Sequence, residues 1–179
     1  MKIYHLFPAL VISALAGCRS NNSATDPHVA IYNDFESMSG WVPEAQLTTL
    51  SRDVAHSGHY SLRAGASNEY SMSFQKPLHQ VFDTQPTKIK ISVWALLSTP
   101  EAKGTLVLTI TNPNTPDAKP LQWTGINLFE AVKVPNKWTE VSQTIKLPAT
   151  ATPESVLTVY LWGNSPQPVY LDDIAIQPE

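Results

Sequence analysis

The chain has 179 residues, of which 42% are hydrophobic and only 15% are charged, and its formal net charge is −3. This composition argues against a nucleic-acid-binding protein, which would show a basic excess, and against a disordered chain, which would combine high charge with few apolar residues. The 15 prolines and 7 glycines exclude collagen-like and glycine-rich linker sequences. The length predicts one domain of about 150 residues with a buried core.

The first 17 residues are predicted to be a signal peptide. Lys2 provides a positive start, and residues 3–16 form a mostly apolar stretch that is too short to span a bilayer as a stable helix. Residues 15–18 read Leu-Ala-Gly-Cys and resemble the lipobox of bacterial lipoproteins, in which the chain is cut before a cysteine that then carries acyl chains. The alternative is an ordinary secretory peptide with an incidental cysteine.

Cys18 is the one cysteine of the sequence, so we expect no internal disulfide, and acyl chains on Cys18 would anchor the protein to a membrane. Residues 19–28 are polar and without periodicity, which is typical of a flexible tether. The residue after the cysteine is Arg19 rather than Asp, which resembles the default sorting of such lipoproteins to the outer membrane. The resemblance implies a lipid-anchored protein of the bacterial cell envelope with a signal peptide (1–17), a lipidated tether (18–28) and a folded domain (29–179).

From residue 29 onward, apolar and polar residues alternate in short runs. The clearest run is residues 88–96, in which every second residue is apolar and would share one face: Ile89, Ile91, Val93 and Ala95. Similar runs rich in Val, Ile, Thr and aromatic residues follow at residues 105–110, 139–147, 155–162 and 169–176. Proline-containing turns separate the runs, and no stretch keeps a helical period for three turns. The sequence therefore predicts an all-β domain, an antiparallel β-sandwich or barrel.

Several sequence pieces also occur in a characteristic order. They are NDFE with a following GW, then DVAHSGHYSL, IKISVW, KWTEVS and VYLDDI, which begin at residues 33, 53, 89, 137 and 169. Together they resemble the carbohydrate-binding modules of families 4, 9 and 22, which share a galactose-binding-like jelly roll. The resemblance spans residues 31–176, matches weakly between residues 67 and 87, and implies a jelly-roll β-sandwich with a carbohydrate ligand.

Proteins of this kind often hold a structural Ca²⁺ that ties the first strand to the last, so the resemblance implies a calcium site here. Its ligands would be the carboxylates of Glu36, Asp172 and Asp173, together with backbone carbonyls from His56 to Gly58. Calcium takes six to eight oxygen ligands, and adjacent carboxylates repel each other unless a cation lies between them. The alternative is a set of carboxylates solvated at strand ends.

Aromatic residues that point away from the core are candidates for stacking on a sugar ring. By strand alternation, Trp94 faces away from Ile91 and Val93, and Tyr160 and Trp162 face away from their apolar neighbours. The predicted ligand surface is one sheet face that carries Trp94, Trp123, Tyr160 and Trp162, with Gln122 and Asn164 as hydrogen-bonding residues. The alternative is that these rings form core beneath covering loops. Structural roles are expected for Trp41, Trp138 and Tyr60.

The sequence carries no catalytic motif that we recognise. It contains neither a Gly-x-Ser-x-Gly motif nor a glycine-rich phosphate loop. His56 and His59 lack further ligands at zinc spacing. A glycosidase needs two carboxylates across one cleft, and the spacing of the acidic residues favours no pair. The chain is therefore predicted not to be an enzyme.

These observations predict a membrane-anchored lipoprotein that binds a glycan or polysaccharide without catalysis. The alternative is a structural or protein-interaction lipoprotein, in which the same β-sandwich docks on another envelope protein through its aromatic residues. An exposed apolar patch with few hydrogen-bonding groups would favour the alternative, whereas aromatic rings interleaved with Gln and Asn would favour a sugar.

Overall fold

The structure is a computed structural model that describes residues 30–37, 48–65, 68–115 and 119–179. The predicted signal peptide, the candidate lipidation site Cys18, the tether and Trp41 lie outside the described residues. Within the described ranges, no helix is long and apolar enough to cross a membrane.

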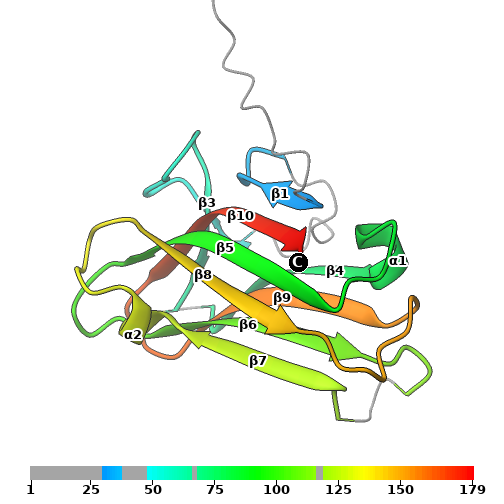
Figure 1. The fold of residues 1–179 in the computed structure, drawn as a ribbon. Helices are drawn as coiled ribbons and strands as arrows, with labels where there is room; N and C mark the ends of the chain where they lie inside the picture. The colour runs from blue at the N-terminus through cyan, green and yellow to red at the C-terminus, as the bar shows by residue number, and fades with distance from the viewer. Residues whose placement is uncertain (1–29, 38–47, 66–67, 116–118) are drawn as a thin grey trace, which may run out of the picture.

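Ten strands in the described residues form two antiparallel sheets, one layered on the other (Figure 1). The larger sheet has the order β2-β3-β10-β5-β8, with β1 also paired to β10; its strands are β1 (Ile31–Asn33), β2 (Leu50–Ser51), β3 (Ser61–Ala64), β5 (Lys88–Leu97), β8 (Thr139–Lys146) and β10 (Val169–Pro178). The smaller sheet has the order β4-β9-β6-β7; its strands are β4 (Tyr70–Pro77), β6 (Gly104–Thr111), β7 (Gln122–Asn127) and β9 (Val156–Gly163). The predicted antiparallel β-sandwich is confirmed.

The core between the sheets consists of the alternating apolar residues that the sequence indicated. The inward residues of β5 and β9 are fully buried and belong to one cluster: Ile89, Ile91, Val93, Ala95, Leu157, Val159 and Leu161. Full burial of a side chain the size of valine or leucine contributes about 1.5–3 kcal/mol relative to leaving it exposed. Strand alternation then sends the other half of each strand, including Tyr160 and Trp162, to the outer face.

Strand β4 lies in a stretch for which the sequence predicted no strand. Its register against β9 shifts between Tyr70 and Ser73, so two consecutive residues, Ser71 and Met72, are both buried. The Ser71 hydroxyl accepts a hydrogen bond of 2.9 Å from the backbone N–H of Leu161 at this bulge. The bulge breaks the simple alternation and leaves Tyr70 on the outer face of the sheet.

The two helices were not predicted either, because four residues are too few to show a helical period. Helix α1 (Leu78–Val81) follows β4, and helix α2 (Leu128–Ala131) follows β7. Helix α2 begins after Asn127, whose side-chain oxygen caps it by accepting hydrogen bonds from the N–H groups of Phe129 and Glu130. This cap fixes the orientation of the Asn127 amide at the end of the smaller sheet.

Strand β10 changes partners along one of its edges. Residues 169–171 pair with β3 and residues 174–176 pair with β1, while β5 runs along the opposite edge. Asp172 and Asp173 lie at this junction, where the register against β5 also shifts and Asp173 adopts a φ of 49°. The loop that precedes β3 contacts Asp172 and Asp173 at this junction through His56 and Ser57, which brings these predicted calcium ligands together.

Candidate functional site

Aromatic side chains gather on the outer face of the four-stranded sheet. Tyr160 and Trp162 come from β9, Tyr70 from the neighbouring β4, and Trp123 from the edge strand β7. The Tyr70 and Trp162 rings stack with their centroids 6.1 Å apart and an angle of 14° between their planes, and Tyr70 meets Tyr160 edge-on at 6.0 Å. We call Tyr70, Trp123, Tyr160 and Trp162 the aromatic platform.

Trp123 lies flat across the backbone of its own strand. A Cβ added at Gly125 would come within 2.4 Å of the Cη2 atom of Trp123, so the ring occupies the space that a side chain would need. Val107 of β6 lies opposite both Gly125 and Tyr160, and it is fully buried although it points to the outer face. The platform therefore has an apolar floor, while Trp123 and Tyr70 remain 53% and 52% exposed on its upper side.

Trp162 is held in place by a polar contact as well as by stacking. Its indole N–H donates a hydrogen bond of 3.1 Å to the carboxylate of Glu69, the residue before β4. A ring that is fixed on one edge and stacked on one face keeps its orientation without a ligand. Such a ring loses little conformational freedom when a ligand stacks on it, which favours binding.

Two shallow hollows lie at the end of the platform, and Asn164 lines both of them. The first, of about 410 Å³, we call the Lys103 hollow; it is lined by Lys103, Gly104, Thr105, Trp123, Gly125, Asn127, Phe129 and Asn164. The second, of about 450 Å³, we call the Glu69 hollow; it is lined by Gly65, Glu69, Trp162, Gly163, Asn164, Ser165 and Pro166. Aromatic rings and amide groups therefore line the same surface, as a sugar-binding face requires.

Four of the six predicted ligand residues, Trp123, Tyr160, Trp162 and Asn164, lie on or beside this surface. The expectation that Trp94 shares the face is wrong, because Trp94 belongs to β5 of the larger sheet and alternation cannot tell one sheet from the other. The expectation for Gln122 is also wrong: it neighbours Trp123 on β7 and therefore points to the opposite side, where its amide donates to Thr124.

The sequence analysis missed several residues of the site, among them Tyr70, Glu69, Phe129, Lys103 and Asn127. The alternation of Tyr70, Met72 and Phe74 is a signal for a strand, but without the bulge it would place Tyr70 in the core. Phe129 is 45% exposed on α2. No periodic pattern indicates the position of a residue in such a short helix.

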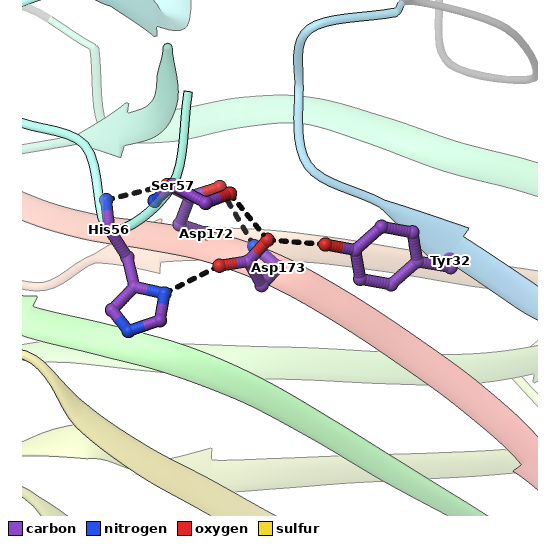
Figure 2. A network of polar contacts seen from close by, with 5 residues as sticks. All are labelled: Tyr32, His56, Ser57, Asp172 and Asp173. Carbon is purple, nitrogen blue, oxygen red and sulfur yellow. Dashed lines mark hydrogen bonds and ion pairs between the residues drawn. The ribbon is translucent and has the colours of Figure 1, made fainter. Parts of the chain in front are cut away.

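A second cluster lies at the junction in β10, on the other sheet (Figure 2). The carboxylate of Asp172 is completely buried and accepts backbone N–H bonds from His56 at 2.7 Å, Ser57 at 3.1 Å and Asp173 at 2.8 Å. Burial outweighs these bonds and raises the pKa of Asp172 to about 6. Asp172 thereby fastens the loop before β3 to the last strand.

Asp173 makes contacts to side chains instead, as Figure 2 shows. Its carboxylate accepts hydrogen bonds from the hydroxyls of Tyr32 at 2.6 Å and Ser57 at 2.7 Å, and it contacts the Nδ1 atom of His56. Burial alone would raise the pKa of Asp173, but these hydrogen bonds outweigh it and lower the pKa. The His56 ring stacks on Trp94 with centroids 3.8 Å apart, so Trp94 packs against this loop.

Trp138, for which a structural role was expected, lies at the same place. Its ring meets the His56 ring edge-on with centroids 5.9 Å apart. Tyr60 packs against the core as a partly buried residue, with the Arg52 guanidinium 4.8 Å above its ring. The Trp138 and Tyr60 rings therefore both pack against other side chains of the protein.

Glu36 fastens the loop from its other side. Its Oε1 atom accepts hydrogen bonds from the N–H groups of His59 at 2.6 Å and Tyr60 at 2.8 Å. Gly58 has a φ of 58°, and a Cβ there would lie 2.5 Å from the Glu36 carboxyl carbon, so glycine is required for this contact. All five residues of the predicted calcium site therefore meet at one corner of the molecule.

The donor set at this corner bears on the predicted calcium site. Backbone N–H groups of the loop, rather than its carbonyl oxygens, point at the carboxylates of Glu36 and Asp172, while side chains contact Asp173. In the part of the chain that the structure describes, no three His, Cys, Asp or Glu side chains are grouped so that they could hold a metal ion. An ion would enter this arrangement only if the loop exchanged N–H groups for carbonyl oxygens.

The fold and the aromatic face together define the class of protein: a jelly-roll β-sandwich with an exposed aromatic platform on one sheet. A family model described as a carbohydrate binding domain, of the 4/9 type, matches residues 27–168 of this chain. The chain belongs to this family, a non-catalytic domain type, as the order of its sequence pieces implied.

Solved structures of related modules share the fold. The chain is similar to the CBM22-1 xylan-binding domain of Paenibacillus barcinonensis Xyn10C, with 17% identity over 84% of this chain and 94% of that domain and a TM-score of 0.55. It is also similar to the CBM22-1–GH10 modules of Clostridium thermocellum xylanase 10B in complex with xylohexaose, with 18% identity over 85% and 28% of the chains and a TM-score of 0.58. A search of curated protein sequences finds no match. At these identities the similarity shows the shared fold.

Proposed function

We propose that this protein binds a polysaccharide along the aromatic platform and does not cleave it. The observation that carries the proposal is the stacked, hydrogen-bonded Trp162 beside two further open rings, Tyr70 and Trp123. The C–H faces of sugar rings pack on aromatic faces, and the neighbouring Asn127 and Asn164 supply hydrogen bonds to hydroxyl groups. Several related modules are named as xylan-binding, so xylan is the first polysaccharide to test.

The carboxylates around the platform support the non-catalytic part of the proposal. Hydrolysis of a glycosidic bond needs two carboxyl groups, about 5–10 Å apart, on either side of the bond. Glu69 is the single acidic residue among those that line the two hollows, and it already accepts a hydrogen bond from Trp162. The described residues that line the hollows therefore supply one of the two groups that a glycosidase requires.

Titration calorimetry with xylan and a panel of soluble β-glucans and mannans tests the proposal. We expect saturable heat with at least one polysaccharide, and Trp162→Ala should weaken that binding at least about 30-fold, which corresponds to about 2 kcal/mol. Trp94→Ala is the matched control, because it removes the same ring from the other sheet. It should leave the affinity unchanged.

A well-folded protein that gives no heat with any polysaccharide would contradict sugar binding. It would favour the alternative of a platform that docks on another envelope protein. The amide and hydroxyl groups between the rings favour the sugar, since a protein-docking patch of this size is expected to be more uniformly apolar.

We also propose that acyl chains on Cys18 anchor this binding domain at the outer membrane. The support is the Leu-Ala-Gly-Cys sequence at the end of a short apolar stretch and the polar residues that follow it. Several buried acyl chains hold a protein durably, because each methylene contributes about 0.8 kcal/mol. Cys18→Ser should move the protein from the detergent phase to the aqueous phase in a partition experiment; retention in the detergent phase would contradict the anchor.

Calcium binding at the corner of Glu36, Asp172 and Asp173 remains a proposal from the family resemblance. The convergence of three carboxylates on one loop supports it, and the N–H groups that donate to Glu36 and Asp172 weigh against it. Extracellular calcium sites of this kind have dissociation constants of about 10⁻⁴–10⁻³ M. Thermal unfolding in millimolar calcium and in EDTA tests this proposal. A higher Tm in calcium than in EDTA supports the site, and equal Tm values contradict it.

A further inference from the structure

The Lys103 hollow differs from the rest of the platform in the kind of polar group that it offers. Among the eight described residues that line it, Lys103 alone is charged. The other polar side chains of its wall belong to Thr105, Asn127 and Asn164, and each amide can present either an oxygen or an NH₂ group to a ligand. Which atom faces the ligand is decided by the hydrogen bonds inside the protein.

Asn127 has its oxygen turned inward. The Oδ1 atom accepts the backbone N–H groups of Phe129 at 3.1 Å and Glu130 at 3.4 Å, because Asn127 caps helix α2. Two N–H donors fix the amide in this orientation, since a flipped amide would turn its NH₂ group toward them. The Nδ2 atom has no hydrogen-bond partner among the described residues and remains a donor.

Asn164 is turned in the same sense. Its Oδ1 atom accepts a hydrogen bond of 3.2 Å from the hydroxyl of Thr105, which lines the same hollow. Its backbone N–H is bonded to the carbonyl of Lys103 at 2.9 Å, so the residue is fixed to the neighbouring loop. Its Nδ2 atom likewise has no acceptor in the described part of the chain.

Lys103 adds a charged donor to these two amides. Its ammonium lies 5.7 Å from the centre of the Phe129 ring, a distance at which the ring face attracts a cation. Phe129 itself is 45% exposed. No carboxylate among the described residues lies within ion-pair distance of Lys103, so its charge has no counterion from the protein.

We infer that the Lys103 hollow is a subsite for an anionic sugar unit, one that carries a carboxylate or a sulfate group, beside the ring that stacks on Trp123. The inference rests on the proposed function and adds the substrate class: an acidic polysaccharide. Three residues that line one hollow, Lys103, Asn127 and Asn164, each carry a donor without an acceptor among the described residues. An anionic group supplies two or three acceptor oxygens with a negative charge. Hydrogen bonds between a charged acceptor and such donors are about twice as strong as those between neutral groups.

The test compares one polymer with and without its charge. Glucuronoxylan and the same polymer after reduction of its carboxyl groups to alcohols have the same backbone for stacking. We expect the native polymer to bind about tenfold more tightly than the reduced one, and we expect this preference to shrink as salt is added. Lys103→Gln should remove most of the preference, because it weakens binding of the native polymer more than binding of the reduced one.

The matched control is Lys146→Gln, which removes the same charge from exposed Lys146 on β8 of the other sheet and should keep the preference. Sulfated xylan distinguishes the two sources of charge: tighter binding than unmodified xylan assigns the subsite to sulfate as well as carboxylate. Equal binding of native and reduced polymers, with both lost in Trp162→Ala, would overturn the inference and leave the proposed function standing. If the protein binds no polysaccharide at all, charged or neutral, both the inference and the proposed function are overturned.

Discussion

Gly163→Ala is expected to destabilise the protein by about 3 kcal/mol, since overpacking against backbone cannot be relieved by a change of rotamer. Gly163 ends β9 in the smaller sheet, and a Cβ there would lie 2.3 Å from the nitrogen and 2.7 Å from the Cα of Gly65, which follows β3 in the larger sheet. Two backbones from different sheets touch at this point. A methyl group would force the sheets apart at the end that forms the Glu69 hollow.

Urea unfolding of the variant and the parent protein measures this effect. Gly104→Ala is the control, because the atoms that an added Cβ would meet there belong to the side chain of Val169, at 3.0 Å, and a side chain can shift. We expect the control to lose less than half as much stability. A loss at Gly163 no larger than at Gly104 would show that the sheets do not depend on this contact.

Asp172→Ala is expected to cost a similar amount, about 3 kcal/mol. The substitution removes the acceptor of three backbone N–H groups while the surrounding chain stays folded over them. Each buried donor left without a partner costs about 1–3 kcal/mol, and water entering the loop recovers part of that. Asp83→Ala removes an exposed carboxylate from a loop and should change stability by less than about 0.5 kcal/mol.

The pH dependence of stability gives a second measurement on the same residue. The pKa of Asp172 is about 6 in the folded chain and about 3.9 when unfolded, so between these values the folded chain binds more protons. The free energy of unfolding should therefore rise, by about 3 kcal/mol at most, as the pH falls from 7 to 4. Asp173 does not oppose this rise, because the contribution of a carboxylate with a lowered pKa is lost only in more acidic solution.

Asp172→Ala should abolish the rise, since it removes the group that takes up the proton. Unfolding of both proteins in urea at a series of pH values provides the comparison. A parent protein whose stability falls steadily from pH 7 to pH 5 would contradict the raised pKa of Asp172.

Much of the fold was predictable because its strands follow the simplest pattern that a chain can carry. Strand β5 alternates from Lys88 to Ala95, and one face of it is buried as Ile89, Ile91 and Val93 indicate. Strand β4 was not predicted although Tyr70, Met72 and Phe74 alternate with polar residues, and the bulge after Tyr70 makes its burial depart from that alternation. Local patterns thus identify regular strands and miss irregular ones.

The candidate site also shows which features a local sequence pattern can predict and which it cannot. Alternation correctly turned Trp94, Tyr160 and Trp162 away from the core, yet it assigned Trp94 to the wrong sheet. Nothing in the local sequence distinguishes the outer face of one sheet from that of the other, because both are half-buried surfaces with a period of two. The pairing of strands distant in sequence, such as β5 with β10, makes that distinction.

The sequence by itself determined the class of fold, the outward direction of most of the aromatic residues and the family, because each depends on patterns within one strand or on the order of short pieces. It also brought Glu36, His56, Gly58, Asp172 and Asp173 together through the family resemblance. The tertiary structure alone decided that loop N–H groups face the carboxylates of Glu36 and Asp172, that Tyr70 joins Trp162, and that the amide oxygens of Asn127 and Asn164 accept hydrogen bonds within the protein. These are relations between atoms far apart along the chain, so their geometry exists only after the two sheets have packed.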